Sequence, residues 1–290
     1  MKTFLTPAIL VLSLFIGTQS AQATGDTKTT QLATNIYTID LLHYTSLVVI
    51  GEEEVLITDT ANPYRANLLK QEIQSLTEKP VGKIVLSHEH FDHTGGTAVF
   101  PDAEIIAHEN IHDYEELDPL DMVPDTIHQT FSTHMTIDMG TTQVELQHMG
   151  IADGAAVAIV HLPAENIVLS ADMYVDEGLG RGVYLTDTNL LGVRKTLKTL
   201  ISWQPKHAIN VHSSSTDLAP LVATAKFLDD LYDLVLPEIK NTLATNPSQL
   251  VPRIIEMSEN LKMPAYKDWP NYQDLPVYIR KMSFAIIHGG

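Results

Sequence analysis

Residues 87–96 constrain the fold of this chain more than any other segment. They read Ser-His-Glu-His-Phe-Asp-His-Thr-Gly-Gly and follow directly on a short apolar run. Side chains two positions apart share a face of an extended segment, so His88 and His90 can converge on one metal ion. Asp92 and His93 come where the chain leaves the strand, and can turn toward a second ion nearby. Imidazole and carboxylate groups suit zinc and related divalent metals, so the segment predicts a metal site at a strand end.

The pattern His-x-His-x-Asp-His after a short apolar strand resembles the signature of the metallo-β-lactamase fold, a large group of mostly metal-dependent hydrolases. The resemblance extends from about Thr38 to His212. It implies a four-layer αββα sandwich, in which two sheets pack face to face with helices outside. It also implies one or two divalent metal ions, zinc foremost, with iron or manganese as alternatives. The motif is specific for the fold and only weakly specific for the substrate.

Two metal sites also need ligands from later strand ends. Asp172 closes an apolar run and is similar to the aspartate that bridges both metals in the family, although Ala171 stands where the family has glycine. His212 ends another apolar run and resembles the last histidine ligand of the family, although the usual Pro-Gly before it is absent. His207 is a competing candidate, but it lies at the start of the expected strand, away from a site gathered at strand ends.

The third ligand of the first metal departs from the family pattern. Counting back from Asp172 through Pro163 places Asp153 where the family has a histidine, and His148 lies five residues earlier, inside an expected strand. We favour Asp153, and His148 remains the alternative, which would require a shift in strand register. With the two histidines of the motif, Asp153 would give the two-histidine, one-carboxylate set known for non-haem iron.

Asp59 ends an early apolar run and matches an aspartate of the family. The resemblance implies that it accepts a hydrogen bond from a ligand imidazole and fixes its tautomer. A helix N-cap is the alternative interpretation. Tyr174, Tyr184 and Lys195 are further candidates for the lining of a pocket, although their spacing does not test this.

The N-terminus predicts export. Lys2 precedes a mostly apolar stretch over residues 5–16, and Ala-Gln-Ala at 21–23 fits the small-residue pattern of a cleavage site. We therefore expect a signal peptide over residues 1–23, a mature chain that begins near Thr24, and a periplasmic or secreted protein. The apolar stretch is too short for a comfortable transmembrane span, so we expect no stable membrane span after cleavage.

Composition restricts the chemistry and the partners. The 290 residues include no cysteine, so a thiol nucleophile and thiolate metal ligands are excluded, and any ligands must be His, Asp or Glu. The formal net charge of −18 repels phosphate backbones, and we therefore do not expect nucleic acid as a partner. A small-molecule substrate is the expected partner. The sequence does not determine the oligomeric state.

Alternating strand and helix patterns predict α/β architecture in one domain over residues 24–290. The expected strands are residues 36–39, 46–50, 55–58, 83–86, 104–107, 143–149, 155–161, 166–170 and 207–211, and the expected helices are 62–78, 191–203 and 216–245. We expect residues 24–31 to be flexible and residues 109–136 to form an irregular rim of the active site. Residues 246–290 contain five prolines and are expected to form a helical C-terminal extension that caps the sandwich or shapes the pocket.

These observations predict metal-assisted hydrolysis of a small ester, lactone, thioester or amide. Two ions a few ångström apart activate a shared water, and Asp92 and Asp172 would hold that water in place. Two alternatives from other classes stay open. One is iron-dependent oxidation on the same fold, by an oxidase or dioxygenase, and the other is a metal-binding relative without catalysis.

Overall fold

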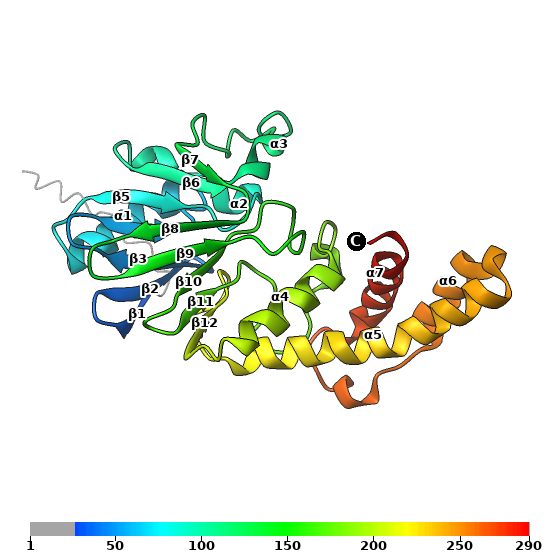
Figure 1. The fold of residues 1–290 in the computed structure, drawn as a ribbon. Helices are drawn as coiled ribbons and strands as arrows, with labels where there is room; N and C mark the ends of the chain where they lie inside the picture. Colours follow the sequence, from blue (N-terminus) through cyan, green and yellow to red (C-terminus); the bar gives the residue numbers. More distant parts are fainter. Residues whose placement is uncertain (1–26, 290) are drawn as a thin grey trace, which may run out of the picture.

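The computed structural model of the chain describes residues 27–289. Over these residues the chain forms two β-sheets stacked face to face, with helices on both outer faces (Figure 1). The predicted αββα sandwich is therefore confirmed. The predicted signal peptide, residues 1–23, lies outside the described residues.

The first sheet has seven strands, whose order in the sheet follows their order in the chain. They are β1 (Lys28–Ala33), β2 (Ile36–Leu41), β3 (Tyr44–Ile50), β4 (Val55–Thr58), β5 (Val81–Val85), β6 (Glu104–His108) and β7 (Gln129–Phe131). Strands β1 to β4 are antiparallel, whereas β4 to β7 are parallel. The parallel strands therefore end at the same edge of the sheet, and helix α1 (Pro63–Leu76) connects β4 to β5.

The second sheet has five strands in the order β12-β11-β10-β9-β8. They are β8 (His134–Asp138), β9 (Gln143–Gln147), β10 (Ile159–Leu162), β11 (Ile167–Leu169) and β12 (His207–Ile209). Helix α4 (Leu190–Ser202) crosses from β11 to β12, which are parallel, so both strands end at the same edge. The other pairs in this sheet are antiparallel.

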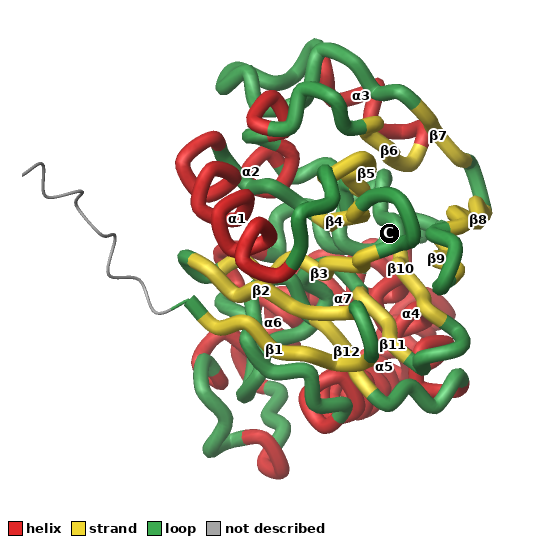
Figure 2. The backbone as a smooth tube through the Cα atoms, turned by 90° about the vertical axis from the view of Figure 1, so that its left-hand side faces the viewer, coloured by secondary structure: helices red, strands yellow, loops and turns green. Residues whose placement is uncertain are grey.

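Apolar side chains fill the space between the layers. Leu47 and Ile106 from the first sheet and Val160 and Leu169 from the second belong to one buried cluster between the sheets. Separate buried clusters join the outer face of the first sheet to α1 and the outer face of the second to α4 and the C-terminal helices. Figure 2 shows both sheets with α1 on one outer face and α4 and α5 on the other. Burial on both faces explains why inner strands such as β4 and β11 are almost continuously apolar, whereas strands near the edges, such as β1 and β8, are largely polar.

The C-terminal part of the chain is helical. Helix α5 (Ala219–Thr245) extends away from the sandwich, and α6 (Leu250–Asn260) and α7 (Leu275–His288) follow it (Figure 1). Helix α7 packs against α4, α5 and α6. Short elements complete the structure: α2 (Phe91–Thr94), α3 (His112–Glu115) and the 3-10 turns η1 (Thr97–Val99), η2 (Glu109–Ile111), η3 (Gly182–Tyr184), η4 (Pro247–Gln249), η5 (Pro264–Tyr266) and η6 (Tyr272–Asp274). Within residues 27–289 no helix combines the length and the apolar character that crossing a lipid bilayer requires.

Three secondary-structure predictions were wrong in part. The segment 24–31 was expected to be flexible, yet β1 begins at Lys28 and pairs with β2. The region 109–136 is not wholly irregular, because it includes β7 and the start of β8. The strand expected at 155–161 begins only at Ile159, because the backbone N–H groups of residues 155, 156 and 158 bond to the metal-binding motif instead of a neighbouring strand.

Candidate metal centre

All seven predicted ligands converge at the edge of the sandwich where strands of both sheets end. The contributing segments are the turn after β5 and helix α2 (His88, His90, Asp92, His93), the β9–β10 loop (Asp153), the end of β11 (Asp172) and the end of β12 (His212). Their candidate ligand atoms form two groups, each within 4.8 Å: His88, His90, Asp153 and Asp172 in one, and Asp92, His93 and His212 in the other. We call His88, His90 and Asp153 the first half-site, and Asp92, His93 and His212 the second half-site.

In each half-site two imidazole nitrogens face one another. His88 Nε2 lies 2.8 Å from His90 Nδ1 in the first half-site. In the second, His93 Nε2 lies 3.1 Å from His212 Nε2 and 3.6 Å from Asp92 Oδ2. These separations place several donor atoms around one small volume in each half-site.

Asp172 lies between the two half-sites. Its Oδ1 is 3.1 Å from His88 Nε2, and its Oδ2 is 3.5 Å from His212 Nε2 and 3.9 Å from His93 Nε2. One carboxylate oxygen therefore faces each half-site, which is the arrangement that a bridging ligand requires. Despite the cost of burial, the hydrogen bond from His212 and the nearby His93 hold the pKa of Asp172 well below its usual range, so the side chain is a carboxylate.

The other nitrogen of each histidine is occupied outside the centre. His88 Nδ1 lies 2.8 Å from Ser87 Oγ, His90 Nε2 lies 2.7 Å from Asp187 Oδ2, His93 Nδ1 lies 3.3 Å from Asp59 Oδ2, and His212 Nδ1 lies 2.9 Å from the His43 carbonyl oxygen. A carboxylate or carbonyl oxygen can only accept, so the nitrogen that faces it donates. In a neutral imidazole the inward nitrogen then carries a lone pair, as a metal ligand must.

Buried polar atoms provide a test of whether these residues fit a metal ion. Asp153 Oδ2 and Asp172 Oδ1 are buried and have no hydrogen-bond partner among the described residues. Burying an unpaired carboxylate oxygen is costly, and facing lone pairs repel one another. Burial also lowers the pKa of His88 to about 3, so its ring is neutral and able to coordinate. Divalent cations would satisfy all of these atoms, and the nitrogen and oxygen donors fit them.

Asp153 occupies the third position of the first half-site. Its side chain is 5% exposed, and Oδ1 accepts a hydrogen bond from Thr188 Oγ1 at 3.3 Å, which leaves Oδ2 free to face the centre. Burial and the nearby Asp172 raise the pKa of Asp153 well above its usual range. A cation at this position would offset that cost by stabilising the charged form.

Glu89, the residue between the two motif histidines, fixes the loop that carries Asp153. Its buried carboxylate accepts hydrogen bonds from the backbone N–H groups of Ala155 and Ala156. Gly154 has a φ of +85°, and a Cβ there would overlap the Glu89 carboxylate. Glycine is therefore the residue that both the backbone conformation and the close approach permit.

His148 and His207, the two competing histidines, lie outside the centre. His148 Nδ1 donates to the Val157 carbonyl oxygen at 2.9 Å, and its ring stacks on His108 with 3.8 Å between ring centroids. His207 lies at the start of β12 and contacts Thr216 Oγ1 at 3.2 Å. The strand register therefore places Asp153, and not His148, beside His88 and His90.

Asp59 contacts a candidate ligand and does not cap a helix. It accepts hydrogen bonds from Ser87 N at 2.8 Å and Ser87 Oγ at 2.6 Å, besides its contact with His93. The N-cap of α1 is Asn62, so the alternative interpretation of Asp59 is wrong. Although burial opposes ionisation, the hydrogen bonds from His93 and Ser87 lower the pKa of Asp59. The charged Asp59 carboxylate thus contacts His93 of the second half-site directly, and it contacts His88 of the first half-site through Ser87.

Sequence reasoning missed several residues that support the centre. Ser87 and Glu89 lie inside the motif, so their proximity to the ligands was visible in the sequence although their roles were not. Tyr44 donates from its hydroxyl to Asp92 Oδ2 at 3.2 Å. Asp187 contacts His90 from 97 positions away in an irregular loop. Neither Tyr44 nor Asp187 belongs to a local pattern that could have identified it.

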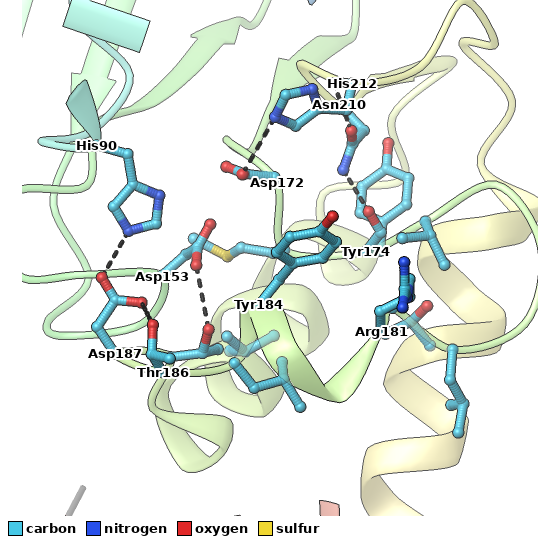
Figure 3. A pocket seen from close by; sticks show the side chains of 18 of the residues that line it. His90, Asp153, Asp172, Tyr174, Arg181, Tyr184, Thr186, Asp187, Asn210 and His212 are labelled. Atoms are coloured by element: carbon cyan, nitrogen blue, oxygen red, sulfur yellow. Dashed lines mark hydrogen bonds and ion pairs between the residues drawn. The ribbon is translucent and has the colours of Figure 1, made fainter. Parts of the chain in front are cut away.

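A cavity of about 1010 Å³ adjoins the metal centre. Candidate ligands line one side, among them His90, Asp153 and His212 (Figure 3). Much of the remaining lining comes from residues 173–190, which we call the pocket loop, and from parts of α5 and α7. Both tyrosines proposed from the sequence, Tyr174 and Tyr184, line the cavity. Lys195 is not among the lining residues, and its ammonium group donates to the Met149 carbonyl oxygen at 2.9 Å.

The C-terminal extension fixes the pocket loop by hydrogen bonds. Three side chains of the extension donate to carbonyl oxygens of the loop: Tyr278 Oη to Gly180 O at 2.8 Å, Asn271 Nδ2 to Leu179 O at 2.8 Å, and Lys281 Nζ to Thr186 O at 3.0 Å. In the other direction, the Gly182 N–H group donates to Asp274 Oδ2 at 2.8 Å, and the Leu179 N–H group donates to Pro270 O at 3.0 Å. Residues 270–281 therefore shape the pocket, which is one of the two roles expected for the extension.

The fold and the ligand arrangement agree with comparisons with known proteins. The family model described as the metallo-beta-lactamase superfamily matches residues 39–212, more than half of the chain. The chain belongs to this superfamily. Among solved structures, a metallo-beta-lactamase from Pontibacter korlensis aligns with a TM-score of 0.60 and 21% identity, covering 71% of this chain and 100% of the other. At that identity the likeness concerns the fold alone.

Two curated relatives are subunits of one enzyme from Nocardioides sp. (strain JS1661). The beta subunit of 2,4-dinitroanisole O-demethylase is 33% identical over 87 residues, which are 29% of this chain and 27% of that protein. The alpha subunit is 30% identical over 143 residues, which are 47% of this chain and 43% of that protein. The matched part spans less than half the length of either relative.

Proposed function

We propose that this protein is a metal-dependent hydrolase that cleaves a small ester, lactone, thioester or amide. The observation that carries the proposal is the set of imidazole nitrogens directed inward, together with two buried carboxylate oxygens that lack partners. Members of the metallo-β-lactamase superfamily are usually metal-dependent hydrolases, which supports the reaction class. The substrate and the metal, for which zinc is the first choice, are parts of the proposal.

The two half-sites would hold the ions, with Asp172 between them. Two divalent ions bound there would activate a water molecule and polarise the oxygen of the substrate carbonyl group. Asp92 and Asp172 would hold that water by accepting its hydrogen bonds. Burial and Asp92 raise the pKa of Tyr44 to about 12, so its hydroxyl stays protonated and keeps Asp92 oriented. The apolar walls of the cavity would exclude other water from the reacting bond.

A substrate panel with metal analysis tests the proposal. The purified protein would be stripped with a chelator, reloaded separately with zinc, manganese or iron, and assayed on lactones, aryl esters, thioesters and β-lactams. The names of the two relatives add 2,4-dinitroanisole, an activated aryl ether, to the panel. We expect hydrolysis that requires bound metal and disappears in Asp172→Ala. Turnover that survives complete removal of metal would refute the proposal.

Iron-dependent oxidation is the second candidate, and the position of Asp153 favours it. His88, His90 and Asp153 offer the two-histidine, one-carboxylate set of many non-haem iron enzymes. The two candidates differ in their oxygen requirement. A hydrolase retains its rate when oxygen is excluded, whereas an oxidase or dioxygenase consumes oxygen in proportion to product. Stable metal binding without turnover on the whole panel would instead indicate the non-catalytic relative.

We also propose that the protein is exported to the periplasm or beyond. The apolar stretch and the Ala-Gln-Ala tripeptide of residues 21–23 support this. N-terminal sequencing of protein recovered from a periplasmic extract should give a chain that begins near Thr24. An intact Met1 on protein confined to the cytoplasm would contradict it.

A further inference from the structure

Arg65 is a buried cation that the proposed reaction does not use. It lies in the first turn of helix α1, and 0% of its surface is exposed. Burying a charge is costly unless hydrogen bonds compensate for it. Burial lowers the pKa of Arg65 to about 10, against the opposing effect of the Asp59 charge, so the guanidinium group remains charged at neutral pH. Its hydrogen bonds therefore indicate what the charge is there to hold.

The guanidinium group of Arg65 donates to two segments of the first sheet. On the β2–β3 hairpin, Nε donates to the Leu41 carbonyl oxygen at 3.2 Å, and Nη2 donates to the Tyr44 carbonyl oxygen at 2.8 Å. Just after β4, Nη1 donates to the Asp59 carbonyl oxygen at 3.1 Å. Nη1 also donates to Ser46 Oγ at 3.0 Å, and Ser46 Oγ donates to the same Asp59 oxygen at 2.7 Å. Because a guanidinium group presents its donors in one rigid plane, Arg65 fixes the hairpin relative to the end of β4.

Both segments have backbone conformations that their residues disfavour. Leu42 and His43, the two residues of the hairpin turn, have φ values of +56° and +67°, and Asp59 has a φ of +41°. Side chains other than glycine rarely adopt positive φ, and a two-residue turn of this kind favours asparagine and glycine. Such conformations persist where the surrounding contacts determine them. The hydrogen bonds from Arg65 are contacts of that kind.

The same two segments carry an outer partner for each ligand of the second half-site. These pairs are Tyr44 Oη with Asp92 Oδ2 at 3.2 Å, the His43 carbonyl oxygen with His212 Nδ1 at 2.9 Å, and Asp59 Oδ2 with His93 Nδ1 at 3.3 Å. Partners of this kind orient metal ligands, and losing one weakens metal binding. A single buried side chain thus lies behind all three pairs.

The first half-site depends mainly on a different segment. His90 and Asp153 have their outer partners in the pocket loop, and the four hydrogen bonds of Arg65 go elsewhere. An indirect contact from Asp59 to His88, through a serine hydroxyl, links the two arrangements. A change at Arg65 should therefore disturb the second half-site more than the first.

We propose that Arg65 is a positioning residue for the second half-site, whose ligands it orients through the β2–β3 hairpin and the end of β4. Its own hydrogen bonds go to backbone carbonyl oxygens and one hydroxyl group, and not to a ligand. The inference rests on the metal centre of the proposed function. It concerns the geometry of that centre and not the reaction.

Arg65→Lys tests the proposal in the metal-free, full-length protein. Lysine keeps the charge, but one ammonium group cannot replace a planar guanidinium that spans both segments. NMR with isotopically labelled histidine detects ring N–H protons that hydrogen bonds protect from exchange with water. We expect protected Nδ1 protons on His93 and His212 in the unsubstituted protein and their loss in Arg65→Lys. The Nε2 proton of His90, which bonds to Asp187, should stay protected in both proteins.

Zinc titration against a competing chelator measures the consequence for metal binding. The NMR signals of the two histidines in each half-site report zinc binding at that half-site separately. We expect Arg65→Lys to weaken zinc binding at the second half-site about tenfold to 100-fold, as when an outer partner is lost, and to change the first by less than about threefold.

Two further variants separate positioning from a general loss of stability. Leu69→Ala opens a cavity one turn further along the same helix, so it should lower the melting temperature and leave both zinc affinities unchanged. Ser46→Ala removes one acceptor of Arg65 and one donor to Asp59, and should weaken zinc binding at the second half-site about threefold. This milder change also decides the matter if Arg65→Lys does not fold.

Three outcomes would overturn the proposal. The first is that the Nδ1 protons of His93 and His212 exchange alike in Arg65→Lys and in the unsubstituted protein. The second is equal weakening of both half-sites by Arg65→Lys, or no effect of Ser46→Ala on either. The third is a loss of zinc affinity at the second half-site in Leu69→Ala, which would indicate general damage. An unsubstituted protein that binds no metal would contradict the proposed function, whereas the metal-free comparison would still decide the role of Arg65.

Discussion

Among residues 27–289, histidine rings meet at two places, and only one of them has the geometry of a metal site. In the metal centre, the rings of His93 and His212 stand edge to face, at an interplanar angle of 82°, and their Nε2 atoms point at one another. Away from the centre, His108 and His148 lie nearly parallel, at 24°, and each turns a nitrogen to a backbone carbonyl. The two arrangements use the same side chain for opposite purposes.

The difference shows what distinguishes a ligand from a packing residue. A ligand histidine has its outer nitrogen tied to an acceptor and its inner nitrogen directed at a shared point, as His90 does with Asp187. In the stack, the rings gain contact area and satisfy backbone groups, and their nitrogens do not converge. The destinations of both nitrogens, and not the number of histidines nearby, decide the role.

The largest expected effect comes from removing the group common to both half-sites. Asp172→Ala takes one carboxylate oxygen from each, so we expect both ions to bind weakly and the metal-dependent rate to fall by about 10³-fold or more, equivalent to about 4 kcal/mol. Elemental analysis after gel filtration and steady-state kinetics measure the two effects. Asp268→Ala removes an exposed carboxylate, 88% accessible, and should change neither. Full metal content in Asp172→Ala would contradict the bridging position.

The next test decides whether Asp153 or His148 is the third ligand of the first half-site. Asp153→Ala should lose the ion of the first half-site, because only two histidines and Asp172 remain there as ligands. The second half-site should keep its ion. His148→Ala should keep full metal content and lose the stacking contact with His108 and the hydrogen bond to the Val157 carbonyl oxygen. Native mass spectrometry counts the ions in each variant. Asp153→His should retain metal, since it restores the usual nitrogen donor of the family. A metal-free His148→Ala protein would reverse the assignment.

A smaller effect should follow from changing the outer partner of one ligand. Asp187→Asn removes the carboxylate that accepts from His90 Nε2, and we expect metal affinity at the first half-site to fall about 10-fold to 100-fold. Asp59→Asn should instead weaken metal binding at both half-sites, because Asp59 contacts His93 directly and His88 through Ser87. Competition with a fluorescent zinc chelator resolves the two affinities. Equal loss at both half-sites in Asp187→Asn would show that the half-sites are not independent.

The smallest expected effect concerns the stack and appears as pH dependence. Burial and His148 lower the pKa of His108 below its ordinary 6.5, so the folded protein keeps this ring neutral. Below about pH 6.5 the unfolded chain takes up a proton that the folded chain does not, and stability is lost as pH falls, by up to about 1.4 kcal/mol per pH unit.

Urea unfolding of the metal-free protein between pH 7.5 and 5.5 measures this loss. His108→Gln should be less stable at pH 7.5, because the stack is gone, but its stability should fall less steeply toward pH 5.5. All other titrating histidines are common to both proteins, so the difference in slope reports the His108–His148 stack. Identical slopes would mean that His108 does not resist protonation in the fold.

The sequence predicted the strand-end ligands because their signals are local. His88, His90, Asp92 and His93 lie within six residues, and Asp172 and His212 each close an apolar run. Asp153 followed from counting along the chain against the pattern of the family. The outer partners could not be predicted in this way, because Asp187 meets His90 only through tertiary packing of an irregular loop.

The fold shows the same division between local and long-range signals. Apolar runs predicted most strands, and the resemblance to the family implied the four layers. Strand β1 was missed because Lys28, Thr29, Thr30 and Gln31 are polar residues whose pairing with β2 decides their conformation. The contacts of residues 270–281 with the pocket loop join segments about ninety positions apart. No periodic pattern in the sequence records such contacts.

The hydrogen bonds between the C-terminal extension and the pocket loop have a consequence for recombining this protein with its relatives. The region matched by the family, residues 39–212, ends before the partners of Gly180, Gly182 and Thr186 begin. A chimaera cut at residue 212 would join a pocket loop from one parent to a foreign tail. The natural unit of exchange is therefore the loop together with residues 270–281, even though almost eighty residues of chain separate them.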